Sequence, residues 1–118
     1  MPIIEISALA PADDFDVPAA LSAVTTEVAA FLGEEPRGTW AIHRPIAPGH
    51  YAEGIDAPAS QPLETHPAIV RVLANRPPEQ VAALLETVGA AVVRAFGLRE
   101  GNVVVRFEAA DPDRMFWG

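Results

Sequence analysis

The sequence predicts an α+β fold in which two tandem β-α-β units form a four-stranded mixed sheet with two helices on one face. Three observations lead to this class. The chain has 118 residues, 50% hydrophobic and 20% charged, which suits one packed domain. A shift of 64 residues aligns its two halves without a gap. Each half contains an apolar extended segment, an amphipathic helical pattern and a second extended segment.

The internal repeat divides the chain into residues 1–54 and 66–118, joined by a connector over residues 55–65. We interpret the two repeats as halves of one domain that share a core. The matched positions are apolar residues at helical spacing and a terminal glycine, namely Leu21 with Leu85, Val24 with Val88, Val28 with Val92 and Gly33 with Gly97.

The first repeat begins with an apolar extended run over residues 3–9. Asp16 is the expected N-cap of the helix that follows, and Pro18 suits its first turn. Gly33 is placed to end this helix with a left-handed backbone conformation. Residues 39–43 are the expected second strand.

The second repeat follows the same plan. Residues 69–73 are the expected third strand, and Pro77 and Pro78 open the second helix. Gly97 is expected to end that helix, and residues 103–107 form the last strand.

The order of elements fixes the two faces of the sheet. A β-α-β crossover makes its two strands parallel and has a right-handed connection. Both helices then lie on one side, and the other face of the sheet is bare. A bare apolar face on so small a chain indicates oligomerisation, so we expect subunits to assemble through their sheets.

Composition excludes several functions. The formal net charge of −8 disfavours nucleic acids and anionic membranes as partners. The chain has no lysine for Schiff-base chemistry and no cysteine for thiolate catalysis or disulfides. It has no apolar run long enough to span a bilayer, and its start lacks the positive segment of a signal peptide. We therefore expect a cytoplasmic protein.

Pro2 is the most unusual candidate for chemistry. Removal of Met1, which is usual before a small residue, would leave Pro2 as a free secondary amine at the start of an apolar strand. An α-amine has an ordinary pKa of about 7.7–8.0, and apolar burial lowers it. Such an amine would be a neutral general base near pH 7. A Met-Pro start without a function is the simpler alternative.

Two arginines are candidates for binding an anion. Arg76 ends the third expected strand, just before Pro77 opens a helix, and a guanidinium beside a helix N-terminus suits a carboxylate. A solvated surface arginine is the alternative. Arg106 lies inside the apolar run 103–107, where an arginine is costly unless it is paired or faces a cavity.

Aromatic and acidic residues complete the candidates. Trp40, Phe116 and Trp117 are expected to line an apolar pocket, although Trp40 also suits the core. Glu53 could activate a water molecule or be a solvated loop residue. The three histidines have no metal-ligand spacing, so we expect no metal site.

Four segments resemble one family. They are Met1–Pro2–Ile3–Ile4, Gly49–His50–Tyr51, Arg76–Pro77–Pro78–Glu79–Gln80 and Met115–Phe116–Trp117–Gly118. Together with the repeat, they resemble the tautomerase superfamily, whose type member is 4-oxalocrotonate tautomerase. The resemblance is to the fused branch, which includes malonate semialdehyde decarboxylase and cis-3-chloroacrylic acid dehalogenase.

The resemblance implies a function. It assigns proton transfer on a small 2-oxo or 2-hydroxy carboxylic acid to Pro2, and carboxylate binding to Arg76. It also implies a homotrimer that needs no cofactor. His66 takes the place of the proline in the second repeat, so each chain would carry one working site.

Departures from the family pattern leave alternatives open. Trp40 and Val104 replace its second arginine, and Arg106, on the same strand face as Val104, is the candidate to substitute for it. Trp117 stands where dehalogenases have their water-activating glutamate, and Glu53 is the matching residue in the first repeat. We therefore expect a keto–enol tautomerase. The alternatives are a cofactor-independent hydratase, dehalogenase or decarboxylase, and a non-catalytic trimer that binds small molecules.

Overall fold

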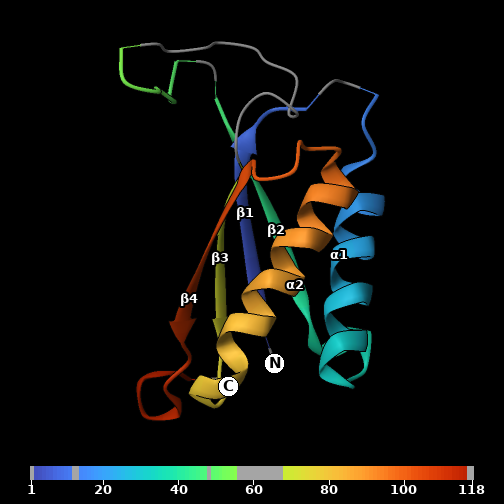
Figure 1. Ribbon diagram of the computed structural model, residues 1–118, viewed down its shortest axis with the longest axis vertical. Helices are drawn as coiled ribbons and strands as arrows, with labels where there is room; N and C mark the ends of the chain where they lie inside the picture. The colour runs from blue at the N-terminus through green and yellow to red at the C-terminus, as the bar shows by residue number, and fades with distance from the viewer. Residues whose placement is uncertain (1, 12–13, 48, 56–67, 117–118) are drawn as a thin grey trace.

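The computed structural model describes residues 2–11, 14–47, 49–55 and 68–116. Its main elements follow the order strand, helix, strand twice along the chain (Figure 1). They are β1 (Ile3–Leu9), α1 (Val17–Leu32), β2 (Trp40–Ile46), β3 (Ala68–Ala74), α2 (Pro78–Phe96) and β4 (Val103–Ala109), with 3₁₀ turns η1 (Pro36–Gly38) and η3 (Pro112–Arg114). Most of the expected connector lies outside the described residues.

The four strands form one mixed sheet in the order β2-β1-β3-β4. β1 and β2 are parallel, β3 and β4 are parallel, and the central pair β1 and β3 is antiparallel. Each parallel pair is joined through a helix, as parallel strands require. The predicted fold class is therefore confirmed.

Three strands are longer than the sequence indicates, and the expected strand 69–73 gains one residue at each end, to Ala68–Ala74. The expected strand 39–43 continues through Pro45 to Ile46. Proline interrupts pairing on one side only, and β2 tolerates it because β2 lies at an edge of the sheet. The last strand also extends beyond Phe107, to Ala109.

Both helices end at the predicted glycines, and the cap predicted for the first helix is present. A carboxylate oxygen of Asp16 accepts a hydrogen bond from the backbone N–H of Ala19 at 3.0 Å, and Pro18 lies in the first turn. Gly33 and Gly97 end the helices at φ 68° and 66°, where glycine is favoured. Within the described residues, neither helix is both long and apolar enough to cross a lipid bilayer.

Both helices pack on the same face of the sheet, and the core lies between these two layers (Figure 1). Strand residues that point toward the helices, such as Ile4, Ile6 and Val70, are fully buried. Gly89 of α2 lies close to β4, because a Cβ atom there would be 3.3 Å from Cγ2 of Val105. Because Gly89 has no side chain, α2 packs closely against β4 at this point.

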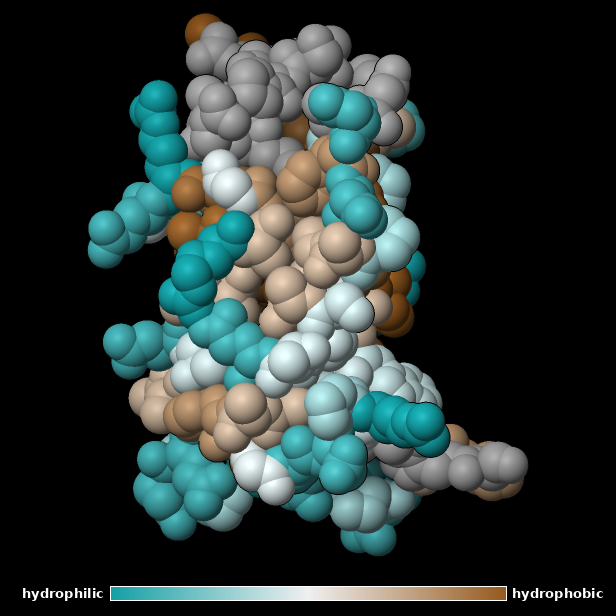
Figure 2. Space-filling model, turned by 90° about the vertical axis from the view of Figure 1, so that its right-hand side faces the viewer, coloured by the Kyte–Doolittle hydropathy of each residue, from teal (hydrophilic) through white to brown (hydrophobic). Residues whose placement is uncertain are grey.

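The two sides of the molecule differ in character. Figure 2 shows the side on which α1 lies, where hydrophilic side chains are interspersed with moderately hydrophobic ones. The helix-free face of the sheet instead exposes large apolar residues, including Trp40, Ile42, Ile69 and Val104. No described residue covers this face with a further layer.

Candidate functional site

Pro2 and Arg76 lie at the same end of the sheet. β1 starts and β3 finishes there, because these strands are antiparallel with Ile3 opposite Leu73. Pro2 directly precedes β1, and Arg76 follows two residues after β3. Figure 1 shows the N-terminus at this lower end. The fold thus places the predicted base and the predicted carboxylate-binding residue at one end of the sheet.

Pro2 is fully buried. Its carbonyl oxygen accepts a hydrogen bond from the backbone N–H of Trp40 at 3.0 Å, which joins the start of β1 to β2. Burial of this kind lowers the pKa of a free amine. While Met1 precedes it, the proline nitrogen belongs to a peptide bond and is not basic. Removal of Met1 is therefore a condition for the predicted role.

Arg76 lies in the turn between β3 and α2. Its Nη2 atom pairs with Oε1 of Glu34, which lies in the loop after α1. The arginine side chain is only 19% exposed, so its hydrogen bonds compete with little water. A guanidinium carries five N–H donors, and contact through Nη2 leaves donors for a carboxylate ligand.

Two of the three predicted aromatic residues are described, and both lie at this end of the sheet. Trp40 starts β2 beside Ile3 on the helix-free face, and its indole N–H donates to the carbonyl oxygen of Arg37 at 3.2 Å. At 45% exposure, Trp40 is not a core residue. Phe116 follows β4 and is 87% exposed. Trp117 lies outside the described residues.

Arg106 is not brought to Pro2 within one chain. It lies in the middle of β4 on the helix-free face, directly beside Arg71 of β3. β3 separates β4 from β1. Arg106 is therefore two strands away from β1, the strand that Pro2 precedes.

Glu53 lies at the other end of the sheet. β2 runs parallel to β1, so the segment that follows β2 is remote from the start of β1 (Figure 1). Oε1 of Glu53 accepts a hydrogen bond from the hydroxyl of Tyr51 at 2.7 Å. Burial, this hydrogen bond and the carboxylate charge raise the pKa of Tyr51 to about 12. Within one chain, Glu53 is not beside Pro2.

Sequence reasoning missed two residues at the Pro2 end. Glu34 contacts Arg76 across 42 positions of sequence, and no local pattern signals such a contact. Arg114 lines a hollow of about 430 Å³ on the sheet, which also contains Leu73 and Met115. Its position depends on the path of the chain after β4, which the apolar pattern does not specify.

The remaining chemistry of the described residues is limited. A second, more apolar hollow of about 450 Å³ lies between α2 and β4, and no predicted site residue lines it. In the described ranges, no group of three or more histidine, aspartate or glutamate side chains is arranged to hold a metal ion. The candidate site is thus the Pro2 end of the sheet.

No protein-family model and no curated protein matches the sequence. Solved structures match its fold. A fused 4-OT in an asymmetric trimer has a TM-score of 0.80 at 8% identity and covers 98% of this chain and 92% of that one. A malonate semialdehyde decarboxylase has a TM-score of 0.69 at 14% identity, with 98% and 90% covered. A protein inactivated by 2-oxo-3-pentynoate has a TM-score of 0.75 at 19% identity, with 96% and 89% covered.

These similarities define the fold. The chain has the fold of the tautomerase superfamily. The fused 4-OT structures match over 92% and 98% of this chain, so the match includes both of its β-α-β units.

Proposed function

We propose that the protein is a keto–enol tautomerase that acts on a small 2-oxo or 2-hydroxy carboxylic acid. The observation that carries the proposal is the position of buried Pro2 at the same end of the sheet as Arg76, in a tautomerase fold. The reaction removes a proton next to a carbonyl group and returns it elsewhere. It needs one base and one anion-binding group, and this end of the sheet holds a candidate for each.

The chemistry follows from the two residues. Arg76 binds the substrate carboxylate and orients the adjoining carbonyl. The neutral amine of Pro2 takes a proton from the enol oxygen, and the electron pair shifts so that the enolate carbon becomes nucleophilic. The protonated amine then delivers the same proton to that carbon, which gives the ketone and regenerates the base. The reverse sequence forms the enol.

The remaining site residues have supporting roles. Trp40, Phe116 and Trp117 would form apolar walls that exclude water. Arg106 would stabilise developing negative charge at the site of a neighbouring chain, because its own chain holds it away from Pro2. The proposal therefore includes a homotrimer that assembles through the helix-free face, with a small carboxylate as ligand.

A hydratase, dehalogenase or decarboxylase on the same scaffold is the alternative proposal. The similarity to a malonate semialdehyde decarboxylase supports it. A water-adding reaction needs an acid near Pro2. Within one chain, Glu53 lies at the opposite end of the sheet from Pro2. The tautomerase proposal requires no such acid. A non-catalytic binding protein remains the outcome if Pro2 carries no free amine.

Covalent labelling tests the proposed base. The reagent 2-oxo-3-pentynoate, which inactivates one structural neighbour, is an alkynyl ketone that an amine attacks at the carbon remote from the ketone. The amine nitrogen bonds to this carbon and its proton moves to the adjacent carbon, so the adduct has the whole mass of the reagent. We expect a single adduct at Pro2 by mass spectrometry of protein that lacks Met1.

Two variants control this experiment. Arg76→Ala should label about tenfold to a hundredfold more slowly at low reagent concentration, because it lacks a charge-assisted hydrogen bond to the reagent's carboxylate. Arg99→Ala removes an exposed arginine outside the candidate site and should label at the normal rate. Retention of Met1 in the mature protein, or adducts elsewhere with Pro2 unmodified, would overturn the proposal.

A further inference from the structure

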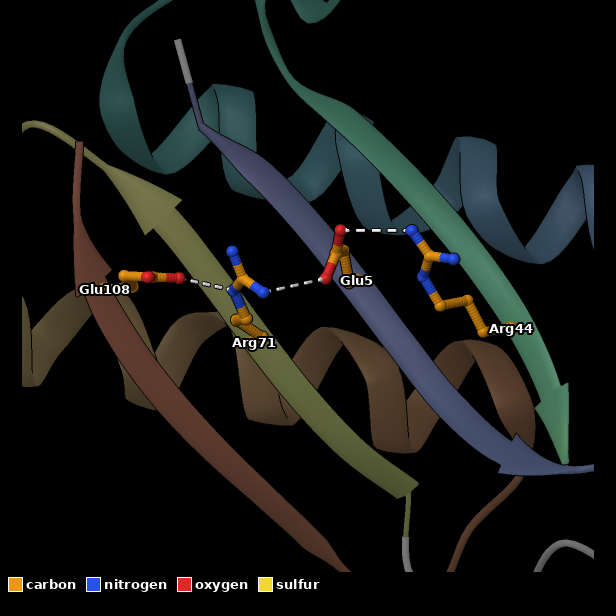
Figure 3. Close-up of polar contacts among 4 residues, drawn as sticks. All are labelled: Glu5, Arg44, Arg71 and Glu108. Atoms are coloured by element: carbon orange, nitrogen blue, oxygen red, sulfur yellow. Dashed lines mark hydrogen bonds and ion pairs between the residues drawn. The ribbon is translucent and has the colours of Figure 1, made fainter. Parts of the chain in front are cut away.

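Four charged side chains form a row across the helix-free face, one from each strand (Figure 3). They alternate in sign in the order Arg44, Glu5, Arg71 and Glu108, from β2 to β4. Arg44 Nη2 is 3.3 Å from Glu5 Oε1. Arg71 Nη1 is 3.7 Å from Glu5 Oε2, and Arg71 Nε is 2.5 Å from Glu108 Oε2. We call these four residues the charged row.

Apolar side chains border the charged row on the same face. Ile42, Ile3 and Leu73 lie on one side of it. On the other side, Ile46 and Ile69 alternate with Ser7 and Arg106. An exposed apolar surface of this kind favours association. A polar group within an apolar interface fixes the register of the partners, as a buried polar residue does in coiled coils.

The two ends of the charged row carry opposite charges at opposite edges of the sheet. Arg44 lies on the edge strand β2 and Glu108 on the edge strand β4. Their side chains are 59% and 45% exposed, although each makes an ion pair toward the centre of the sheet. Head-to-tail association sets the β2 edge of one copy against the β4 edge of the next, and such contacts form a ring when the rotation between copies closes. A cation then meets an anion at every junction.

The charged row also has the slope that a ring requires. Glu5 and Arg71 are directly opposite, whereas the two outer pairs are offset by two positions each, in the same sense. Four residues of rise over three strand spacings correspond to a slant of about 40°. Strands in closed barrels tilt by about 35–45°, so a row with this slant runs around the barrel axis. Figure 3 shows the charged row crossing the slanted strands in a straight line.

We propose that the charged row continues from subunit to subunit, with Arg44 of each copy paired to Glu108 of the next. The occupant of the helix-free face is therefore further copies of this chain in head-to-tail order. The charged row sets their register, and the apolar residues beside it supply most of the contact. This inference rests on the proposed trimer but not on its chemistry, so an inactive protein would leave it intact.

A double-mutant cycle on assembly tests the pairing. The variants are Arg44→Gln, Glu108→Gln and the combination of both, and the readout is the protein concentration at which trimers dissociate, by sedimentation velocity. Each single change should raise this concentration. In the double variant, the increase should be about fivefold or more smaller than the product of the two single increases. Arg44 and Glu108 do not touch within a chain, but Glu5 and Arg71 link them there. The same cycle on the free energy of unfolding of the dissociated chain measures that internal coupling, and the excess seen in assembly reports a contact between copies.

A control pair and a charge exchange complete the design. Arg99→Gln and Glu100→Gln, which are exposed in the loop between α2 and β4, serve as a control pair and should not alter dissociation. Where a single charge reversal prevents assembly, the exchange of Arg44→Glu with Glu108→Arg should restore it in part, because it rebuilds the pair between copies but loses the ion pairs with Glu5 and Arg71 within each chain. The inference would be overturned if the wild-type protein were a monomer at all concentrations. It would also be overturned if the two single increases simply multiplied in the double variant while the circular dichroism of all variants stayed unchanged.

Discussion

In the candidate site, the Nη2 atom of Arg76 is paired with the carboxylate of Glu34. Glu34 follows the glycine that ends α1, and its backbone N–H donates to the carbonyl oxygen of Ala29 at 3.0 Å. Its carboxylate therefore belongs to a fixed loop. If Arg76 binds the substrate carboxylate as proposed, Glu34 is a positioning residue that aims the remaining donors of Arg76 at that carboxylate.

The Glu34→Gln variant tests this role. A neutral amide holds the guanidinium less firmly, so we expect KM to rise about threefold to tenfold while kcat stays within about twofold. The exposed neighbour Glu35 provides the control Glu35→Gln, for which we expect normal kinetics. A lower KM in Glu34→Gln would show that Glu34 competes with the substrate for Arg76, which contradicts the positioning role.

His43 is a second residue with a distinct environment. Its imidazole packs against Phe96, with ring centroids 5.5 Å apart. Its Nε2 atom is buried and has no hydrogen-bond partner among the described residues. Burial lowers the pKa of His43 from its ordinary value of 6.5, because the charged imidazolium is poorly solvated there.

This environment predicts a loss of stability in mild acid. Above pH 6.5 His43 is neutral in both the folded and the unfolded chain and adds no pH dependence. As the pH falls below that value, the unfolded chain takes up a proton that the folded chain binds less readily, so stability declines until the folded pKa is passed. Thermal denaturation of wild type and His43→Phe between about pH 8 and pH 5 should show a steeper loss in wild type. Equal pH dependence in both proteins would contradict the assignment.

At the scale of elements, the start of α1 depends on one side chain. The hydrogen bond from Ala19 N–H to Asp16 satisfies a backbone donor that the helix cannot pair internally. The Asp16→Ala variant should lower the free energy of unfolding by about 0.5–2 kcal/mol, whereas Asp16→Asn keeps an acceptor and should lose less. Urea denaturation at one fixed protein concentration measures both, beside an Asp14→Ala control. A loss as large in the control would show that the cap is not responsible.

The elements themselves were largely predictable, because their signals are local. Asp16, Gly33 and Gly97 mark helix ends through side-chain and backbone preferences that act within a few residues. The extent of β2 was not predictable in the same way. Pro45 argues against a strand in a local pattern, and only the edge position of β2 makes it acceptable.

At the scale of the whole molecule, the antiparallel pairing of β1 with β3 creates the candidate site. This pairing places the end of the second repeat's first strand next to the start of the chain, so Pro2 and Arg76 share one end of the sheet. The repeat and the resemblance indicated this arrangement. The same topology places Glu53 at the opposite end, which the sequence left open.

Contacts between distant residues set the limit of sequence reasoning. The pair of Glu34 with Arg76 and the charged row both depend on the register of strands and on loop paths, which no short pattern encodes. In the proposed trimer, the pocket walls would depend on neighbouring copies as well. The fold could thus be predicted nearly in full, whereas the site could be predicted only as a set of candidate residues.

Ketonisation of an enol such as phenylenolpyruvate tests whether Pro2 transfers the proton. Ultraviolet absorbance follows the rate from about pH 5 to pH 9. We expect a rate above buffer that falls about a hundredfold or more in Pro2→Ala, as loss of a general base does. The rate should decline toward acid through one group whose pKa lies below that of an ordinary amine, because burial disfavours the charged form. No rate above buffer with Met1 confirmed absent, or an equal rate in Pro2→Ala, would contradict the account.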